Sequence, residues 1–487
     1  MKKILNLLYF ILLILSYYLT KNTNMFLLTI SFSLLIIYSG IFSTMSIKKR
    51  LESLYDKKYY YSMNKIFKGS ILLIGIIGLV LAAISYLIGL LLNIKGIFIV
   101  SISMCLYLIT KEIINIEGEY LSVIKYKKLG NNLNDIYKFV NTILLIIGII
   151  LLYKVFNLDN YINISILYLI SVVTFIVFNI LFYIFIFKKN KYVKKREENK
   201  INYIKEVKRI LATNRMATTA SIIQGSYIYL SIVILYFILI NKYNYSYDTV
   251  GMYITNIYFY GISVVYIIYK IIENIYEDKF NEIKNKINNK EECNIYNFIN
   301  NIVMSTMTTT IIMIIVAKPL NNLLFNNQDI NIVLNVSYLL LFYVLYITTT
   351  KISMICNKEK NVFIVLLVGV LVTLMTSIPL IDASYRMGYN LVGGSLISII
   401  LGFSVSTIIY IILINKKLKL SLLDNFNNIL NIIYESIIYA LFLVLFTFIV
   451  KVDINGIIRS ILVILFYIFI SIMFYIVKEK IIGKRVQ

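Results

Sequence analysis

The chain has 487 residues, of which 60% are hydrophobic, and its mean hydropathy is +0.82. An ordinary soluble domain contains about 45–50% apolar residues, so a soluble core could not bury this much apolar surface. Runs of about 20 apolar residues are long enough to cross a hydrocarbon core of roughly 30 Å as helices. The composition therefore predicts an all-α polytopic membrane protein.

Residue usage also argues against several kinds of chemistry. The chain has no His and no Trp, and its three cysteines, Cys105, Cys293 and Cys356, are widely separated. This spacing predicts neither a disulfide framework nor a Cys-x-x-Cys metal site. The sequence contains no nucleophile–base pattern and no Gly-rich phosphate-binding loop. We therefore expect no enzyme activity, no catalytic residue, no metal and no cofactor.

Clusters of charged residues and Asn divide the apolar sequence into about fourteen predicted membrane spans. The first follows Met1-Lys2-Lys3 and lacks a small-x-small cleavage site, so we expect a retained helix rather than a signal peptide. The predicted spans cover residues 4–20, 25–46, 67–92, 96–116, 136–153, 161–187, 210–241, 248–270, 296–316, 330–350, 361–381, 388–414, 429–450 and 457–477.

The formal net charge of +24 is distributed in a way that predicts topology. Most Lys and Arg residues lie in alternate connections, and cytoplasmic loops carry such an excess. Both termini are therefore predicted to be cytoplasmic. We therefore interpret the basic residues as marking the cytoplasmic side, where some of them contact anionic lipid. We do not expect them to form a nucleic-acid-binding surface. The basic segments are the N-terminus, 47–68, 117–135, 188–209, 270–295, 351–360, 415–428 and 478–487.

The most basic connection, Lys188 to Arg209, separates six predicted spans from eight. Transporters are often built from repeated halves with the substrate path between them. We therefore expect two pseudo-symmetric six-helix lobes followed by a helix pair. The predicted parts are an N-terminal lobe at 1–187, a basic cytoplasmic linker at 188–209, a C-terminal lobe at 210–414, and a terminal helix pair with a tail at 415–487.

Three stretches carry a resemblance to a known family. "KIFKGSILLIGIIGLVLAAISYLIG" resembles a basic passage leading into a Gly-rich third helix, and "AKPLNNLLFNNQD" resembles the loop after helix nine. "YNLVGGSLISIILGFSVSTIIYIILINKKLKL" is similar to helix twelve. Together they resemble the polysaccharide-export branch of the multidrug/oligosaccharidyl-lipid/polysaccharide (MOP) exporter superfamily. The similarity is greatest to stage V sporulation protein B and MviN-like flippases.

This resemblance implies a monomeric flippase in a bacterial cytoplasmic membrane. It implies that an undecaprenyl-diphosphate-linked glycan crosses between leaflets by alternating access of the two lobes. Lipid II flippases of the MviN type carry cavity arginines in helices one, two and eight. Here the first two predicted spans contain no charged residue, and Lys48 is the first one after the second span. In helix eight, Thr255 and Asn256 occupy the region where the arginine would fall. A different lipid-linked glycan or another arrangement of cations therefore stays open.

Polar residues inside predicted spans are the candidates for the substrate path, because burying them in hydrocarbon is costly. Arg215 lies just inside helix seven and either anchors at the inner interface or contacts a lipid diphosphate. Gln224 lies about 13 Å deeper along that helix, at 1.5 Å per residue. Asn256 occurs among Tyr253, Tyr258 and Tyr260, whose rings either stack on sugars or pack in the core.

Lys111 and Glu112 in helix four form either a local ion pair or a coupling site. The coupling would use H⁺, Na⁺ or the membrane potential. Two further functions remain open: a cation-coupled exporter of small molecules, like the MATE transporters, and a non-transporting membrane scaffold. The exporter hypothesis would favour deep acidic residues in the N-terminal lobe, whereas the sequence suggests that the carboxylates lie near helix ends.

Overall fold

The computed structural model describes most of the chain and contains several gaps. Arg215, Gln224 and the span predicted at 25–46 lie outside the described residues. The described residues are 2–20, 51–52, 54–57, 59–91, 96–156, 158–189, 223, 227–289, 295–325, 331–356, 359–388, 392–418, 422–449 and 457–483.

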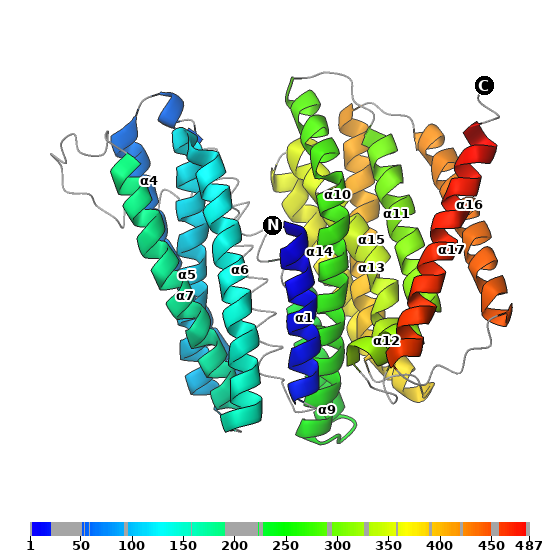
Figure 1. The fold of residues 1–487 in the computed structure, drawn as a ribbon, viewed down its shortest axis with the longest axis horizontal. Coiled ribbons are helices and arrows are strands. Elements are labelled where there is room, and N and C mark those ends of the chain that lie inside the picture. The colour runs from blue at the N-terminus through cyan, green and yellow to red at the C-terminus, as the bar shows by residue number, and fades with distance from the viewer. Residues whose placement is uncertain are drawn as a thin grey trace. The chain divides into compact units, whose positions relative to one another are not determined.

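The described part folds into two compact helical units, residues 1–255 and 256–487 (Figure 1). The first contains α1 (Lys2–Thr20), α4 (Tyr60–Leu91), α5 (Ile97–Leu121), η1 (Ser122–Tyr126), α6 (Lys127–Leu151), η2 (Leu152–Phe156), α7 (Asn160–Lys189) and α9 (Tyr247–Ile254). The boundary falls inside η4 (Thr255–Gly261). The second contains α10 (Ile262–Asn289), α11 (Ile295–Ile315), α12 (Ala317–Phe325), α13 (Ile332–Cys356), α14 (Glu359–Arg386), α15 (Gly393–Leu418), α16 (Leu422–Ile449) and α17 (Ile457–Gly483).

In the first unit α5 lies against α4, α6 and α7, and α1 packs on α6. Aromatic rings fill the space between these helices. The Tyr107 ring lies 5.3 Å from the rings of both Tyr168 and Phe175, and the Tyr137 ring meets Phe175 edge-on at 5.6 Å. Such pairs add about 0.5–1.5 kcal/mol beyond the burial of their area, so they help to fix the register of α5 against α6 and α7.

In the second unit α15 packs against α13 and α14, while α10 and α11 also lie against α13. The terminal helices join this bundle through α11 and α12, where Val316 packs with Tyr439, Leu443 and Tyr467. Figure 1 shows α12 at the lower end of α17, the red helix. Gly394 permits the close contact of α15 with α14, because a Cβ there would clash with the Leu380 carbonyl oxygen.

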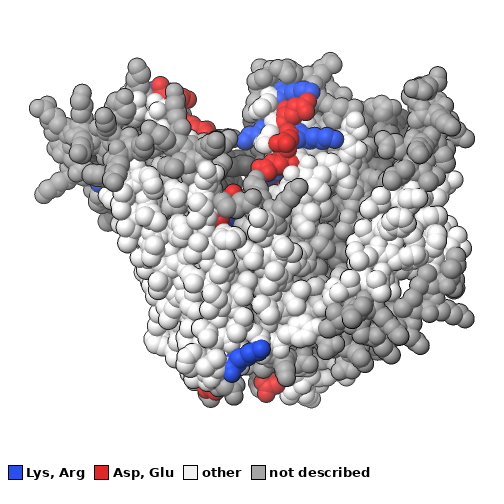
Figure 2. All heavy atoms as spheres, viewed as in Figure 1, with Lys and Arg blue, Asp and Glu red and all other residues white. Residues whose placement is uncertain are grey.

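Length and composition fit a membrane protein. Among the described residues, nine helices are long and apolar enough to cross a membrane, and four shorter apolar helices accompany them. Many Leu, Ile and Val side chains on these helices are exposed, as expected where lipid is the solvent. Figure 2 shows charged side chains of α10 gathered at its upper end, above a long uncharged surface. The chain is an all-α polytopic membrane protein, as predicted.

Apart from the segments outside the described residues, every predicted span coincides with helix. Two connections predicted as cytoplasmic segments are themselves helical. Residues 117–135 continue from α5 through η1 into α6, and most of 270–295 belongs to α10. The predicted spans end where charged residues begin, because the prediction follows the length of the apolar run. The helices themselves continue further, since Lys, Glu and Asn are tolerated within a helix.

The loop predicted at 317–329 is also wrong in part, because its first nine residues form α12. Pro319 lies in the first turn of α12, where its missing N–H costs no hydrogen bond. The buried Asn321 Oδ1 then accepts hydrogen bonds from Ile332 N at 2.9 Å and Val333 N at 3.4 Å. These bonds satisfy donors at the start of α13, so α12 caps the helix that follows it.

We predict that Gly394→Ala lowers the stability of the protein by about 1–3 kcal/mol, the usual cost of overpacking a tight contact. The added Cβ would push α15 away from the backbone of α14. Gly75→Ala is the matched control, since its Cβ would meet nothing within 4 Å. Thermal unfolding of both variants in detergent tests the contact, and equal melting temperatures would contradict it.

Candidate functional site

The continuous helical stretch from α9 to α10 is interrupted by the π-helical segment η4, residues 255–261. Thr255 Oγ1 donates to the Gly251 carbonyl at 2.7 Å, and the Tyr258 and Ser395 hydroxyls share a hydrogen bond that ties η4 to α15. Gly261 lets η4 approach α13, since a Cβ would lie 2.6 Å from Val336 Cγ1. π-Helical turns are rare and often occur at functional sites.

Asn256, one of the predicted substrate-path residues, lies at the start of η4. Its side chain is 2% exposed, and its Nδ2 is buried without a hydrogen-bond partner. A buried donor without a partner costs about 1–3 kcal/mol. The amide is therefore a donor that a ligand could use. A polar uncharged group of this kind suits a hydroxyl or carbonyl better than it suits a phosphate.

The two predicted tyrosines differ in their surroundings. Tyr260 is 2% exposed, with its ring 5.0 Å from Phe259 and 6.2 Å from Phe325 of α12. Its ring is thus part of the core, which was one of the two alternatives raised by the sequence. Tyr253 lies in α9 and is half-buried. Of the two rings, that of Tyr253 has more surface left for a ligand.

The predicted coupling pair lies in α5 of the first unit, and its two side chains have different direct partners. The Lys111 ammonium lies 6.0 Å from the centre of the Tyr107 ring. Glu112 is 1% exposed, and its Oε1 accepts a hydrogen bond from Asn115 Nδ2 at 3.1 Å. Tyr107 and Tyr137 both lie close enough to Glu112 to interact with it electrostatically. Glu112 therefore sits in a buried polar cluster between α5 and α6.

Sequence reasoning missed a second buried carboxylate on the same helix. Glu117 is 3% exposed, and its Oε2 has no hydrogen-bond partner. Both acids lie in the second half of α5, and Glu117 lies close to its C-terminal end, as the sequence suggested. The charge-rich sequence "KEIINIEGEY" suggested an interface, and it did not reveal that the Glu117 side chain is buried among the helices.

A cluster of charges in the second unit was also missed. Lys270 and Glu273 lie on α10, and Lys351 of α13 pairs with Glu273. The pair Lys270–Glu273 is visible in sequence as an i, i+3 contact, but the third member is 78 residues away. Among the described residues, no group of three His, Cys, Asp or Glu side chains could hold a metal ion.

The whole fold has counterparts among solved structures. The lipid II flippase MurJ in its inward closed conformation matches with a TM-score of 0.56 and 16% sequence identity, over 97% of this chain and 98% of that one. An outward-facing multidrug resistance MATE family transporter of the MOP superfamily matches with a TM-score of 0.51 and 11% identity, over 86% and 96%.

The chain has the fold of these two solved structures. No protein-family model and no curated protein matches the sequence. The resemblance found in three sequence stretches thus agrees with the fold of nearly the whole chain. At 16% and 11% identity the likeness extends to the fold alone, so the substrate has to be inferred from this chain's own residues.

We predict that Asn256→Leu leaves the melting temperature unchanged or raises it, because the substitution removes a buried donor without a partner. Asn321→Leu is the matched control: it removes the cap of α13 and should cost about 0.5–2 kcal/mol. Thermal unfolding in detergent measures both. A loss of stability in Asn256→Leu as large as in Asn321→Leu would show that the Asn256 amide is a structural contact.

Proposed function

We propose that the chain is a flippase for a lipid-linked glycan carried on undecaprenyl diphosphate. In this proposal it moves the glycan from the inner to the outer leaflet of a bacterial cytoplasmic membrane. The lobes at 1–187 and 210–414 alternate access, and the linker at 188–209 and both termini face the cytoplasm. The protein acts as a monomer, contacts membrane lipids and performs no covalent chemistry.

The extent of the structural likeness is the observation that carries this proposal. The match with the lipid II flippase covers 97% of this chain, so it extends into the terminal helices α16 and α17. The match with the MATE transporter covers 86%. Because the flippase shares its fold with more of this chain than the MATE transporter does, we use the flippase to infer the class of substrate.

The chemistry of η4 supports a glycan. Sugars offer hydroxyls and carbonyls, which accept hydrogen bonds from neutral donors such as the Asn256 amide. Apolar sugar faces stack on aromatic rings, and Tyr253 is the half-buried candidate. In the proposal the Arg215 guanidinium contacts the diphosphate through charge-assisted hydrogen bonds, with Gln224 farther along the path.

Coupling is assigned in this proposal to the buried acidic region of α5. Lys111 and Glu112 are the coupling residues, and the driving force is H⁺, Na⁺ or the membrane potential. A carboxylate buried in an apolar helix changes its interactions strongly when it gains or loses a cation. Glu112 lies among Tyr107, Asn115 and Tyr137, so a change of its charge would be felt by α5 and α6 together.

The same acidic region favours a second candidate function, cation-coupled export of small molecules. That function would need deep carboxylates in the N-terminal part of the chain. Glu112 and Glu117 are 1% and 3% exposed on the single helix α5, and this burial of two carboxylates in the N-terminal part of the chain is what favours the second candidate. The two candidates share a fold and differ in what the path accepts, so a transport experiment has to separate them.

Depletion of the protein separates the two functions. We predict that undecaprenyl-diphosphate-linked glycan accumulates at the inner leaflet in depleted cells, while efflux of cationic dyes is unchanged. Lipid extraction with mass spectrometry and a dye-efflux assay measure the two outcomes. Re-expression of the wild type or Gly75→Ala should clear the glycan, whereas Asn256→Leu at the same membrane abundance should not.

Dye efflux that depends on the protein, without accumulation of a lipid intermediate, would support small-molecule export and reject the flippase. Absence of both effects would favour the scaffold hypothesis. Full clearance of the glycan by Asn256→Leu would remove Asn256 from the substrate path but leave the flippase proposal standing.

A further inference from the structure

Two lysines from different helices of the second unit hold the same carboxylate. Lys270 Nζ donates to Glu273 Oε2 at 2.6 Å, and Lys351 Nζ donates to Glu273 Oε1. The Tyr269 hydroxyl donates to Oε1 at 2.8 Å and accepts from Lys351 Nζ at 2.8 Å. The two ammonium groups are thus placed on the two oxygens of one carboxylate, one from α10 and one from α13.

Tyrosine rings form one side of this cluster. Lys270 Nζ lies 5.6 Å and 5.3 Å from the ring centres of Tyr266 and Tyr269, and Lys351 Nζ lies 5.6 Å from that of Tyr269. The Tyr343 ring meets Tyr269 edge-on at 5.5 Å. These contacts fix the long lysine side chains before any ligand binds. Preorganisation of this kind lowers the entropy cost of binding.

The two ammonium groups have more hydrogen-bond donors than Glu273 and Tyr269 use. Each ammonium carries three N–H donors. Lys270 uses one on Glu273, and Lys351 uses two on Glu273 and Tyr269. Both lysine side chains remain accessible, at 37% and 36% exposure. Glu277, which is exposed one turn farther along α10, also interacts electrostatically with Lys270.

We propose that Lys270 and Lys351 form a binding site for a phosphate headgroup of a membrane lipid, where the part of α10 predicted to be cytoplasmic begins at residue 270. Two oxygens on one phosphorus present the same forked pattern as the Glu273 carboxylate, so a phosphate fits the unused donors of both ammoniums. The inference rests on the proposed function for one of its two ligand sources, the diphosphate of a lipid-linked glycan. The other source is an anionic phospholipid.

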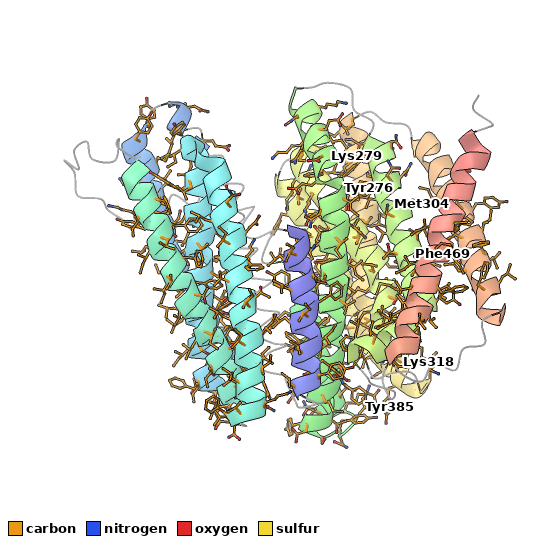
Figure 3. The ribbon with its side chains drawn as sticks, viewed as in Figure 1. Tyr276, Lys279, Met304, Lys318, Tyr385 and Phe469 are labelled. Carbon is orange, nitrogen blue, oxygen red and sulfur yellow. The ribbon has the colours of Figure 1, made fainter. Side chains whose placement is uncertain are left out.

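A purely structural role makes a different prediction at Glu273. If the cluster only holds α10 against α13, replacing Glu273 and replacing either lysine should change lipid binding in the same direction. If it binds phosphate, Glu273→Gln removes a competing anion and strengthens binding, whereas Lys270→Gln and Lys351→Gln weaken it. Lys279→Gln is the matched control, because Lys279 lies on the same helix over the Tyr276 ring at 5.9 Å (Figure 3).

The experiment measures binding of undecaprenyl diphosphate to the purified full chain in detergent, with undecaprenol as the phosphate-free control. We expect each Lys→Gln variant to lose about tenfold or more in affinity, as for loss of one charge-assisted hydrogen bond. Glu273→Gln should bind more tightly, and Lys279→Gln should match the wild type. Lys351→Arg should retain binding, and melting temperatures establish that each variant is folded.

Competition with phosphatidylglycerol separates the two sources of phosphate. Weak competition supports the lipid diphosphate as ligand, and equal competition supports the site with phospholipid as its occupant. Wild-type affinity in both Lys→Gln variants, or weaker binding by Glu273→Gln, would overturn the inference. Lysine-dependent binding without glycan accumulation on depletion would reject the proposed function alone, whereas accumulation without such binding would reject the site alone.

Discussion

The hydrocarbon of the bilayer offers no hydrogen-bond partner, and this constraint determines the rest of the structure. Backbone groups are satisfied within helices, which is why the chain is built from them. Polar side chains follow the same rule locally: the hydroxyls of Thr306, Ser337 and Thr350 each donate to a carbonyl four residues earlier. Hydroxyls satisfied in this way add polarity to the bundle without creating a binding site.

Against this background, polar groups without a local partner are informative. The Asn256 amide in η4 and the Glu117 carboxylate in α5 are each buried with an unused atom. The cluster around Glu273 has the opposite character, since two cations share one anion and remain accessible. In the proposals made above, the neutral donor contacts a glycan, the buried acid serves a coupling ion, and the cation pair binds a phosphate.

Apolar length predicted the helices well, because a run of about 20 apolar residues has few alternatives in a membrane. It failed where the deciding interaction is tertiary or lies outside the apolar run. The start of α13 is capped by Asn321 of α12, and the extension of α10 beyond residue 270 is polar. Asn256 could be proposed from sequence because an amide is conspicuous in an apolar span. Lys351, in contrast, lies in a segment predicted as a basic loop, and only the packing of α13 on α10 places it beside Glu273.

Reconstitution tests the central claim most directly. The purified chain would be placed in liposomes containing a fluorescent glycan on undecaprenyl diphosphate, with a membrane-impermeant reductant added outside to quench the outer leaflet. Without the protein, about half of the fluorescence should remain protected, because the bilayer core strongly opposes passage of the polar headgroup. The account predicts that the wild-type chain exposes the protected fraction, while protein-containing liposomes with Asn256→Leu retain it. Protection unchanged by the folded wild-type chain, under any ion gradient or membrane potential, would contradict it.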